Sequence, residues 1–508
     1  MPRRNLAIIL IAAILSIACY GRAQRNRFAS LFAEAVHRIS SSYVREVDER
    51  QLFEDAMQGM LGQLDPYSTY IGPEQYLEFK SDIDQEFGGI GIIVSPNPKT
   101  KHLLVLSPIV GTPAHQAGLL AGDTIVKVDD MDIDNFTMAE TVKHLRGKPG
   151  TDVRLSVLHR GDDEAIEVTI TRAVIKVPSV LGDTIRQDGS WNFVLESQSN
   201  VGYIRLTTFG ERTIEELESA IQSLDTDHLV GLILDLRSNA GGLLEAATAT
   251  CDMFINQGEI VTLRGRSALV RDRRVASQGT TVDTDLPLAV LINKYSASAS
   301  EIVAACLQDH NRAVIVGERS YGKGTVQNVI PLELGKSVMK LTTATFWRPS
   351  NKNIHRAKDA DDDGDWGVTP NEGYLVALSE EEFRQLILAR NKADYQGFEF
   401  QADDHSKTTL DNQVEKDPDT KAKASEKAPN SDKETSHVDP ETSNVKTQDE
   451  PSENNLGTES GPPATNTEHA ENQTNDKAVK TIDDPQLRRA VEYILETSQN
   501  KSAPADAA

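Results

Sequence analysis

A serine-rich stretch, Ser296-Ala-Ser-Ala-Ser-Glu, stands between an apolar run that predicts a buried strand and an apolar run that predicts a helix. Small residues at a strand-to-helix turn let the backbone curve sharply and leave one hydroxyl group exposed. The backbone N–H groups of the first helical turn then point toward whatever that hydroxyl attacks. The stretch therefore predicts a serine nucleophile, although an ordinary serine-rich N-cap has the same composition.

A lysine in a glycine loop follows the next predicted strand. The stretch reads Tyr321-Gly-Lys-Gly-Thr-Val-Gln, which leaves Lys323 with almost no neighbouring side chains in sequence. An ammonium packed against apolar groups loses hydration, so its pKa falls and it can serve a serine hydroxyl as general base. A solvated lysine in a glycine turn is the alternative. Gln327 can reach this amine only if the segment forms a helical turn, because four residues of strand span about 13 Å.

A third stretch could stabilise negative charge. Leu234-Asp-Leu-Arg-Ser-Asn-Ala-Gly-Gly-Leu-Leu ends a predicted central strand and opens a helix. Gly241 or Gly242 can present a bare N–H to an oxyanion, and the Ala299 N–H is a candidate second donor. A plain strand–helix turn is the alternative interpretation of this stretch.

The elements that must position these groups alternate between strand and helix after Gly202. The predicted order is strand, helix, strand, helix, strand, helix, strand, over Tyr203–Leu206, Thr213–Leu224, Leu229–Leu236, Leu243–Ile255, Leu288–Ile292, Ser300–Leu307 and Ala313–Val316. Leu229–Leu236 is almost continuously apolar, which is typical of a strand buried on both faces. The alternation predicts an α/β fold with a mostly parallel sheet.

Composition bounds the rest of the chain. A length of 508 residues favours two to four domains. The balance of 53 Lys and Arg against 77 Asp and Glu gives a net charge of −24, which argues against non-specific nucleic-acid binding. Three cysteines exclude a disulfide scaffold, and their spacing suggests no structural zinc. No cofactor is expected.

The N-terminus predicts export. Two arginines precede an uncharged apolar run from Leu6 to Cys19, and small residues allow cleavage after Ala23. The run is short for a spanning helix, although an uncleaved membrane anchor is an alternative. Ser16 stands where a lipoprotein signal has leucine, which disfavours lipidation at Cys19. We expect a periplasmic or cell-envelope protein.

The C-terminal part of the chain has a different composition. Residues 401–492 contain no Phe, Tyr or Trp, and acidic residues outnumber basic ones. Such a segment buries too little apolar surface to offset ordering entropy, so residues 401–484 are predicted to be a disordered acidic linker. Residues 485–498 predict an amphipathic helix that docks, mediates oligomerisation or frays.

Together, the three chemical stretches resemble the C-terminal processing (tail-specific) serine proteases over about residues 28–375. The resemblance implies a ClpP/crotonase-like protease core over residues 175–400. Ahead of it, apolar residues such as Leu31, Ala35 and Ile39 recur at helical spacing, which predicts a helical region over residues 25–85. It implies a catalytic set of nucleophile, base, supporting amide and oxyanion donors: Ser298, Lys323, Gln327, Ala299 and either Gly241 or Gly242. The long acidic tail is not part of the family pattern.

A peptide-binding module is predicted over residues 86–174, where short strands alternate with glycine turns. Gly89-Ile-Gly-Ile resembles the carboxylate-binding loop of a PDZ domain, which would be inserted in the protease. The backbone N–H groups of Ile90, Gly91 and Ile92 could cradle a substrate's terminal carboxylate while the peptide adds a strand. The helix over Met138–Leu145 would form the other wall of this groove.

These features predict an exported serine endopeptidase that binds protein or peptide substrates by their C-termini and cleaves through an acyl-enzyme. A homo-oligomer, an activating adaptor and membrane association through the N-terminus are further expectations. The rival is a catalytically silent PDZ scaffold. Asp359–Asp365 resembles the start of a calcium loop, but Pro370 takes its last ligand position, which favours a solvated acidic loop. A triad with His310 or His355 has no support in the spacing.

Overall fold

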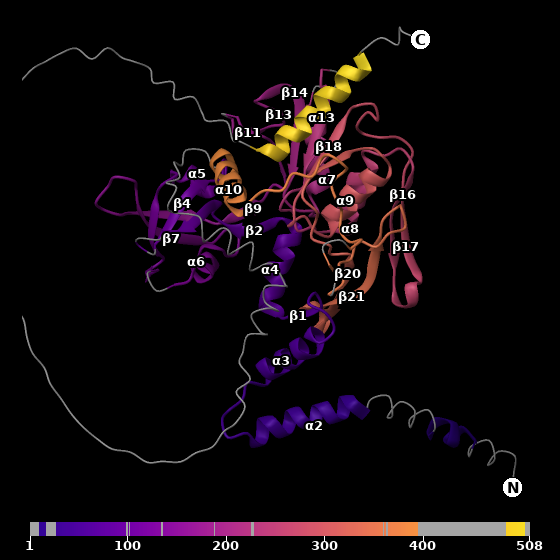
Figure 1. The fold of residues 1–508 in the computed structure, drawn as a ribbon. Helices are drawn as coiled ribbons and strands as arrows, with labels where there is room; N and C mark the ends of the chain where they lie inside the picture. Colours follow the sequence, from indigo (N-terminus) through magenta and orange to yellow (C-terminus); the bar gives the residue numbers. More distant parts are fainter. Residues whose placement is uncertain are drawn as a thin grey trace, which may run out of the picture.

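Figure 1 shows a computed structural model of the chain, which describes residues 10–16, 27–97, 100, 102–133, 136–186, 188–224, 228–358, 360–361, 364–394 and 484–502. Most of the predicted signal peptide or anchor (1–24) lies outside the described residues. So does the predicted acidic linker, apart from Asp484. Within the described part, no helix combines the length and the apolar character that a membrane crossing requires.

Helices dominate the N-terminal region, as the periodicity predicts. Its elements are α2 (Arg27–Ser42), α3 (Glu49–Gly62), β1 (Thr69–Ile71) and α4 (Pro73–Asp84). The Asp48 carboxylate begins α3 by accepting the N–H groups of Arg50 and Gln51. Strand β1 pairs antiparallel with β21 (Ser337–Trp347), so backbone pairing joins this region to the rest of the molecule.

The predicted PDZ region is an antiparallel sheet with its own core of buried residues, including Val105, Ile125 and Leu155. The strands follow the order β3-β4-β5-β7-β8, and β6 pairs with β5. Its elements are β3 (Ile92–Pro96), β4 (Leu103–Pro108), α5 (Pro113–Gln116), β5 (Thr124–Val128), β6 (Met131–Asp132), α6 (Met138–Leu145), β7 (Asp152–Leu158) and β8 (Ile166–Thr171). Strands β2 (Glu86–Gly89) and β9 (Ala173–Lys176) pair with each other, which brings the two ends of the module together as an insertion requires.

The central sheet confirms the predicted mostly parallel α/β core. Four parallel strands follow the order β14-β15-β18-β19, and β10 and β13 pair antiparallel with β14. These strands are β10 (Val180–Leu181), β13 (Val194–Leu195), β14 (Gln198–Leu206), β15 (Gly231–Asp235), β18 (Leu288–Ile292) and β19 (Val314–Gly317). Every residue of β15 is buried, as its apolar run predicts.

Helices cover both faces of this sheet. Side chains of α7 (Thr213–Ser223), α8 (Leu244–Asp252) and α9 (Ala299–Asp309) share one core with alternate strand residues such as Ile204 and Leu232. The opposite face packs against α13 (Pro485–Ser502), the yellow helix of Figure 1.

The C-terminal helix is a docked element, which resolves the alternatives that the sequence leaves open. Ala490 and Ile494 of α13 are fully buried. A side chain at Gly231 would collide with Ile494, so this glycine makes room for the helix. The carboxylate of Asp484 accepts two hydrogen bonds from Arg237, both 2.9 Å, and Arg237 also pairs with Asp235. A buried charged cluster therefore fixes the beginning of α13 at the end of β15.

A second sheet completes the core and follows the order β1-β21-β16-β17, with β20 on β21. Its further strands are β16 (Gly258–Arg264), β17 (Val270–Ala276) and β20 (Thr325–Leu332). The remaining described elements are β11 (Thr184–Ile185), β12 (Trp191–Asn192), η1 (Arg266–Ala268), η2 (Glu333–Gly335) and α10 (Glu380–Asp394). Cys251 and Cys306 are buried free thiols, in keeping with the absence of a predicted disulfide scaffold.

Candidate active site

The serine-rich stretch forms the predicted turn between β18 and α9. Ser298 directly precedes α9 with φ 55° and ψ −112°, a conformation that costs energy for a residue with a side chain. The flanking serines hold the turn: Ser296 Oγ donates to the Leu236 carbonyl (2.8 Å) and Ser300 Oγ to the Asn239 carbonyl (2.9 Å). The turn is therefore tied to the loop after β15.

The two predicted sources of oxyanion donors meet at this turn. A Cβ on Gly241 would lie 2.8 Å from Ser298 Cβ and 2.9 Å from the Ala299 nitrogen, so the glycine loop touches the nucleophile turn. The Gly241 N–H is already used, since it donates to Asn239 Oδ1 (2.8 Å). The Gly242 and Ala299 N–H groups make no hydrogen bond to another described residue, which leaves them available to a ligand.

Lys323 occupies the tight loop that the sequence predicts. Its ammonium lies 5.0 Å from the centre of the Tyr67 ring. Burial and, to a smaller extent, the nearby Lys340 cation lower the pKa of Lys323 from 10.5 to about 8, while the Glu301 charge opposes both effects. Gly322 adopts φ +87°, and a Cβ there would meet Arg356 at 2.8 Å. The loop thus has to be glycine-rich to bring a desolvated amine to this place.

A buried carboxylate links the serine turn to the lysine loop. Glu301 Oε2 accepts the N–H groups of Ser298 (2.8 Å) and Lys323 (2.9 Å). Its other oxygen accepts the Gly322 N–H (2.7 Å) and the Ser320 hydroxyl (2.5 Å). Burial raises the pKa of Glu301 to about 7, although these four donors pull it the other way. Glu301 closes the quoted serine motif, but its role as a link between two loops was not predicted.

The segment at Gln327 does not form the helical turn that contact with Lys323 would require, so the supporting role of Gln327 stays a prediction. Instead of a helical turn, Gln327 lies in strand β20, where a register shift separates it from Val326. Its amide nitrogen donates to Thr325 Oγ1 (2.9 Å) and Thr342 Oγ1 (3.2 Å). Pairing with β21 outweighs local coiling here. The described residues show no hydrogen bond from Lys323 Nζ to either Gln327 or Ser298.

The N-terminal region contributes to the site through a turn at Asp65, another role that the sequence did not reveal. The Asp65 carboxylate accepts the N–H groups of Tyr67 and Ser68, both at 2.8 Å, and Thr342 Oγ1 donates to it at 3.1 Å. Asp65 therefore fixes the Tyr67 ring under the lysine and connects it to the Gln327–Thr342 pair. Only proximity in the fold reveals this link, because Tyr67 and Lys323 are far apart in sequence.

The predicted carboxylate loop runs from the last residue of β2 into β3. Gly91 adopts φ +81°, and its carbonyl accepts the Ile109 N–H (3.0 Å), while the Ile90 carbonyl accepts the Ala114 N–H (2.9 Å). The N–H groups of Ile90 and Gly91 make no hydrogen bond within the described residues. Gly89 and Ile92 are held in β2 and β3. The loop presents free donors, as a carboxylate site requires.

Neither histidine builds a triad with Ser298. His310 Nε2 lies 2.8 Å from the Glu259 carbonyl, to which it is hydrogen-bonded. His355 packs beside Gly324, and burial lowers its pKa, so it is neutral at neutral pH. No group of three or more His, Cys, Asp or Glu side chains in the described part could hold a metal ion. Asp359, Asp362 and Asp363 lie outside that part, so the calcium-loop hypothesis stays untested.

Three family models match successive parts of the chain. The chain matches the models of the activating protease CtpB N-terminal domain (residues 21–75), a PDZ domain (88–170) and peptidase family S41 (200–372). The carboxy-terminal-processing protease of Bartonella bacilliformis is 38% identical over 404 residues, which cover 77% of this chain and 87% of that protein.

Two further proteins are similar over most of their length. The carboxyl-terminal-processing protease of Synechocystis sp. is 33% identical over 320 residues, covering 63% of this chain and 72% of that protein. A solved photosystem II D1 C-terminal processing protease is 27% identical with a TM-score of 0.38, covering 68% of this chain and 86% of that one. The chain belongs to the carboxy-terminal-processing proteases of peptidase family S41 and is a serine-type endopeptidase with an inserted PDZ domain.

Proposed function

We propose that this protease is exported and cleaves substrates held by their C-termini, with Ser298 as nucleophile and Lys323 as general base. The observation that carries the mechanism is the buried Lys323 amine, whose pKa of about 8 coexists with a direct Glu301 link to the serine turn. At pH 7 roughly one such amine in eleven is neutral, compared with roughly one in 3,000 at a pKa of 10.5. Export is supported by the charged and apolar pattern of residues 1–24.

The reaction would proceed in two steps. The neutral Lys323 amine takes the proton of the Ser298 hydroxyl as its oxygen attacks the scissile carbonyl, and the leaving amine receives that proton. The N–H groups of Ala299 and Gly242 stabilise the oxyanion. Water, deprotonated by the same lysine, then hydrolyses the acyl-enzyme.

One rearrangement would precede this chemistry. Lys323 Nζ lies 5.0 Å from the centre of the Tyr67 ring and forms no hydrogen bond with Ser298 within the described residues, so the amine has to reorient toward the hydroxyl. The Glu301 bonds would keep the two backbone loops together during that movement, because they involve main-chain N–H groups of both loops. The contact with the Tyr67 ring would oppose this movement.

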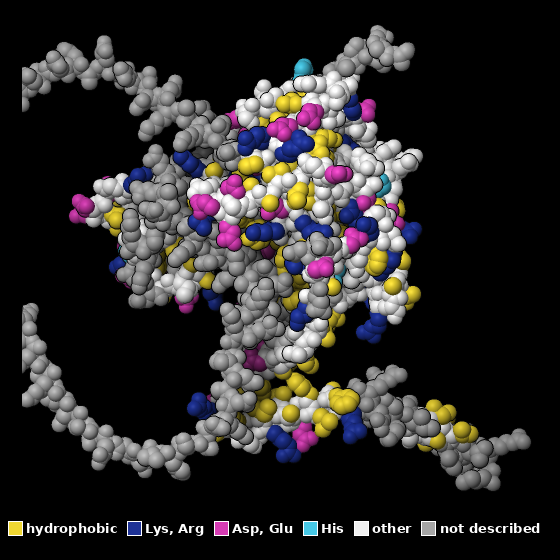
Figure 2. Space-filling model, in the orientation of Figure 1, with side chains coloured by type: hydrophobic (Ala, Val, Ile, Leu, Met, Phe, Trp, Pro, Cys, Tyr) yellow, Lys and Arg dark blue, Asp and Glu magenta, His cyan; other side chains and the backbone are white. Residues whose placement is uncertain are grey.

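A PDZ domain next to a protease core can select protein tails. The free N–H groups of Ile90 and Gly91 would bind the terminal carboxylate of the substrate. Self-association or an activating adaptor is also part of this proposal. Helix α2 leaves Phe28 and Leu31 exposed, and Figure 2 shows hydrophobic side chains along it. Membrane association would depend on the apolar run near the N-terminus.

Cleavage of an unstructured protein with an apolar C-terminus tests the proposal. Wild-type protein should cleave it, Ser298→Ala and Lys323→Ala should not, and Ser223→Ala on α7 serves as a serine control. Amidation of the substrate's C-terminus should raise KM, because it removes the carboxylate. Equal cleavage by wild-type and Ser298→Ala protein would exclude Ser298 as the nucleophile. Tail binding without cleavage by any form would favour the silent scaffold.

A further inference from the structure

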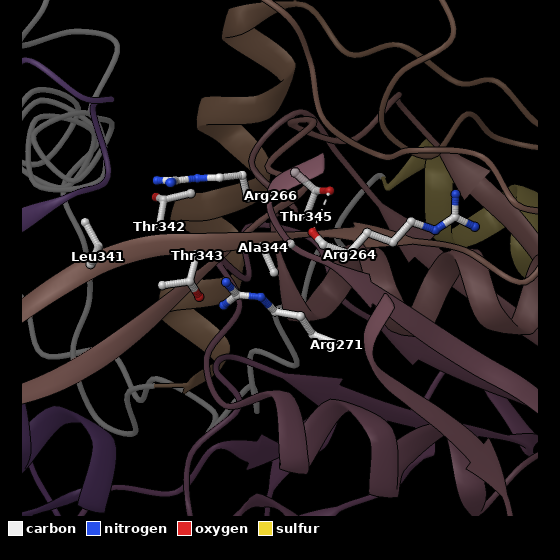
Figure 3. A pocket seen from close by; sticks show the side chains of 9 residues that line it. Arg264, Arg266, Arg271, Leu341, Thr342, Thr343, Ala344 and Thr345 are labelled. Carbon is white, nitrogen blue, oxygen red and sulfur yellow. Dashed lines mark hydrogen bonds between the residues drawn. The ribbon is translucent and has the colours of Figure 1, made fainter. Parts of the chain in front are cut away.

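A cavity of about 710 Å³ lies beside strand β21, in the second sheet of the core (Figure 3). Pockets for small ligands typically measure about 300–1,000 Å³, so this one is large enough for a short peptide segment. It is lined by the end of β16, the start of the loop that follows, the beginning of β17 and one stretch of β21: Arg264, Gly265, Arg266, Arg271, Leu341, Thr342, Thr343, Ala344 and Thr345.

The cavity coincides with a gap in the sheet. Strand β20 pairs with residues 337–345 of β21, which occupies one edge of that strand. On the other edge, β1 pairs with residues 338–340 and β16 with residues 345–347. Residues 341–344 therefore have no strand neighbour on this edge among the described strands. A peptide of four extended residues spans about 13 Å and fits such a gap.

The pairing of β21 is irregular along the gap. Along β20, Val326 pairs with Ala344 and Gln327 with Thr342, so the register skips Thr343. Thr343 thus has no register partner on either side. The Thr342 N–H is used, because it donates to Ser68 Oγ (3.1 Å). An incomplete edge of this kind is where an extended peptide adds main-chain hydrogen bonds.

Two arginines give the gap a positive charge. Figure 3 shows the guanidinium groups of Arg266 and Arg271 directed toward Thr342 and Thr343, whereas Arg264 extends away from them. Arg266 and Arg271 are exposed, and neither forms an ion pair within the described part of the chain. A Cβ at Gly265 would collide with Arg271, so the glycine lets this side chain lie across the gap. In a chain of net charge −24, such a pocket favours an acidic ligand.

The gap also lies close to the catalytic lysine. Strand β20 begins at Thr325, two residues after Lys323, and Thr325 pairs with Thr345 at the end of the gap. Neighbouring strands are about 4.8 Å apart, so a peptide in the gap would lie two strand spacings, about 10 Å, from β20. A substrate long enough to reach Ser298 can therefore also occupy this edge.

We propose that the β21 edge pocket binds a stretch of the substrate polypeptide in extended form and selects an acidic side chain through Arg266 and Arg271. The inference rests on the proposed protease function and deepens it, because it names a substrate class: unfolded polypeptides with Asp or Glu near the cleaved bond. The PDZ domain would bind the C-terminus of the substrate, and the β21 edge pocket would bind an acidic side chain at an internal position of the same substrate.

Matched peptides test this specificity. Fluorogenic substrates that differ only by Glu against Gln at successive positions around the cleaved bond give a ratio of kcat/KM for each position. Two solvent-exposed ion pairs predict a preference of roughly 2- to 30-fold for Glu at one or two positions, weakened by salt. In the double variant Arg266→Gln/Arg271→Gln the ratio should fall to about 1.

The control removes the same charge from β17, the strand that also carries Arg271. Arg273 pairs with Glu259 and Arg274 with Asp272, and neither lines the cavity. The double variant Arg273→Gln/Arg274→Gln should therefore keep the wild-type ratio. Thermal unfolding of both variants separates loss of specificity from loss of fold.

Peptide binding to the Ser298→Ala protein tests the same preference without catalysis. Fluorescence anisotropy with the labelled Glu and Gln peptides should show the same preference and the same dependence on Arg266 and Arg271. If wild-type protein cleaves neither peptide, the proposed protease mechanism fails. The ratio of the Glu and Gln peptide affinities still tests whether the pocket selects an acidic side chain. An unchanged ratio in Arg266→Gln/Arg271→Gln overturns the inference. So does a gain of activity toward both peptides, because it would mean that the chain's own acidic residues fill the pocket.

Discussion

Glu301 should control both the geometry and the rate of the site. Its two oxygens accept four hydrogen bonds, from Ser298, Ser320, Gly322 and Lys323. Glu301→Gln keeps the size of the side chain but replaces one acceptor oxygen with a donor. The least costly orientation turns the new amide toward the Ser320 hydroxyl, which can rotate and accept from it. One backbone N–H, that of Gly322, then loses its partner.

The magnitude follows from that count. A buried donor without a partner costs about 1–3 kcal/mol, so the contact between the serine turn and the lysine loop should be weakened by this free energy. If the penalty falls on the transition state, kcat drops by roughly 5- to 150-fold. Glu301→Ala removes both acceptor oxygens, and with them all four hydrogen bonds. Three backbone donors are left unpaired, at a cost of about 3–9 kcal/mol, enough to unfold many domains.

Peptide hydrolysis measured beside chemical unfolding tests this reasoning. For Glu301→Gln we expect kcat to fall with little change in KM and a modest loss of stability. Glu318→Gln is the matched control, because burial also raises the pKa of this half-buried carboxylate, while its hydrogen-bond partner is the Leu378 backbone, outside both loops. A Glu301→Gln protein with kcat within about twofold of wild type would refute the link between the two loops.

Three further predictions concern the base, the C-terminal helix and the oxyanion loop. Burial and Lys340 lower the pKa of Lys323 to about 8, so kcat/KM should increase with pH in a transition whose midpoint is near 8. Lys340→Met removes a neighbouring cation, so a pH–rate profile of this variant should show a higher midpoint. Asp484→Asn replaces one of two carboxylate acceptors of a buried arginine, so urea unfolding should show a loss of about 1.5–3 kcal/mol and proteolysis should release α13 more readily. Gly241→Ala places a Cβ against the Ser298 turn, at a residue with φ +102°. Its kcat should fall roughly 100- to 1,000-fold, the loss expected when an oxyanion donor is removed. Gly279 has a similar φ of +99° but open space around it, so Gly279→Ala should keep the wild-type kcat.

Local signals in the sequence were sufficient for much of the core. The apolar run of β15, the alternation of strands and helices, and the glycines around Lys323 each depend on neighbouring residues, and the structure confirms the parallel sheet and the tight loop. The docking of α13 could not be read in this way. Its partners on β15 lie about 250 residues earlier, so the amphipathic pattern predicts a helix without its binding surface.

The details of the lysine environment depend on contacts across the fold. Gln327 lies in a strand rather than in the helical turn that contact with Lys323 would require, because β21 supplies a long pairing partner that only tertiary structure reveals. Tyr67 reaches Lys323 from the N-terminal region, and Glu301 accepts donors from a loop some twenty residues later. Residue types were enough to predict a catalytic chemistry, whereas the groups around the lysine became visible only in the structure.

Covalent trapping tests the catalytic proposal most directly. A peptide ester that acylates quickly and deacylates slowly should add the mass of its acyl group to the intact protein, and peptide mapping should place that mass on Ser298. The adduct should form faster as pH rises toward 8 and should be absent from Lys323→Ala. An adduct on another residue, or one that forms equally fast in Lys323→Ala, would contradict the serine–lysine mechanism.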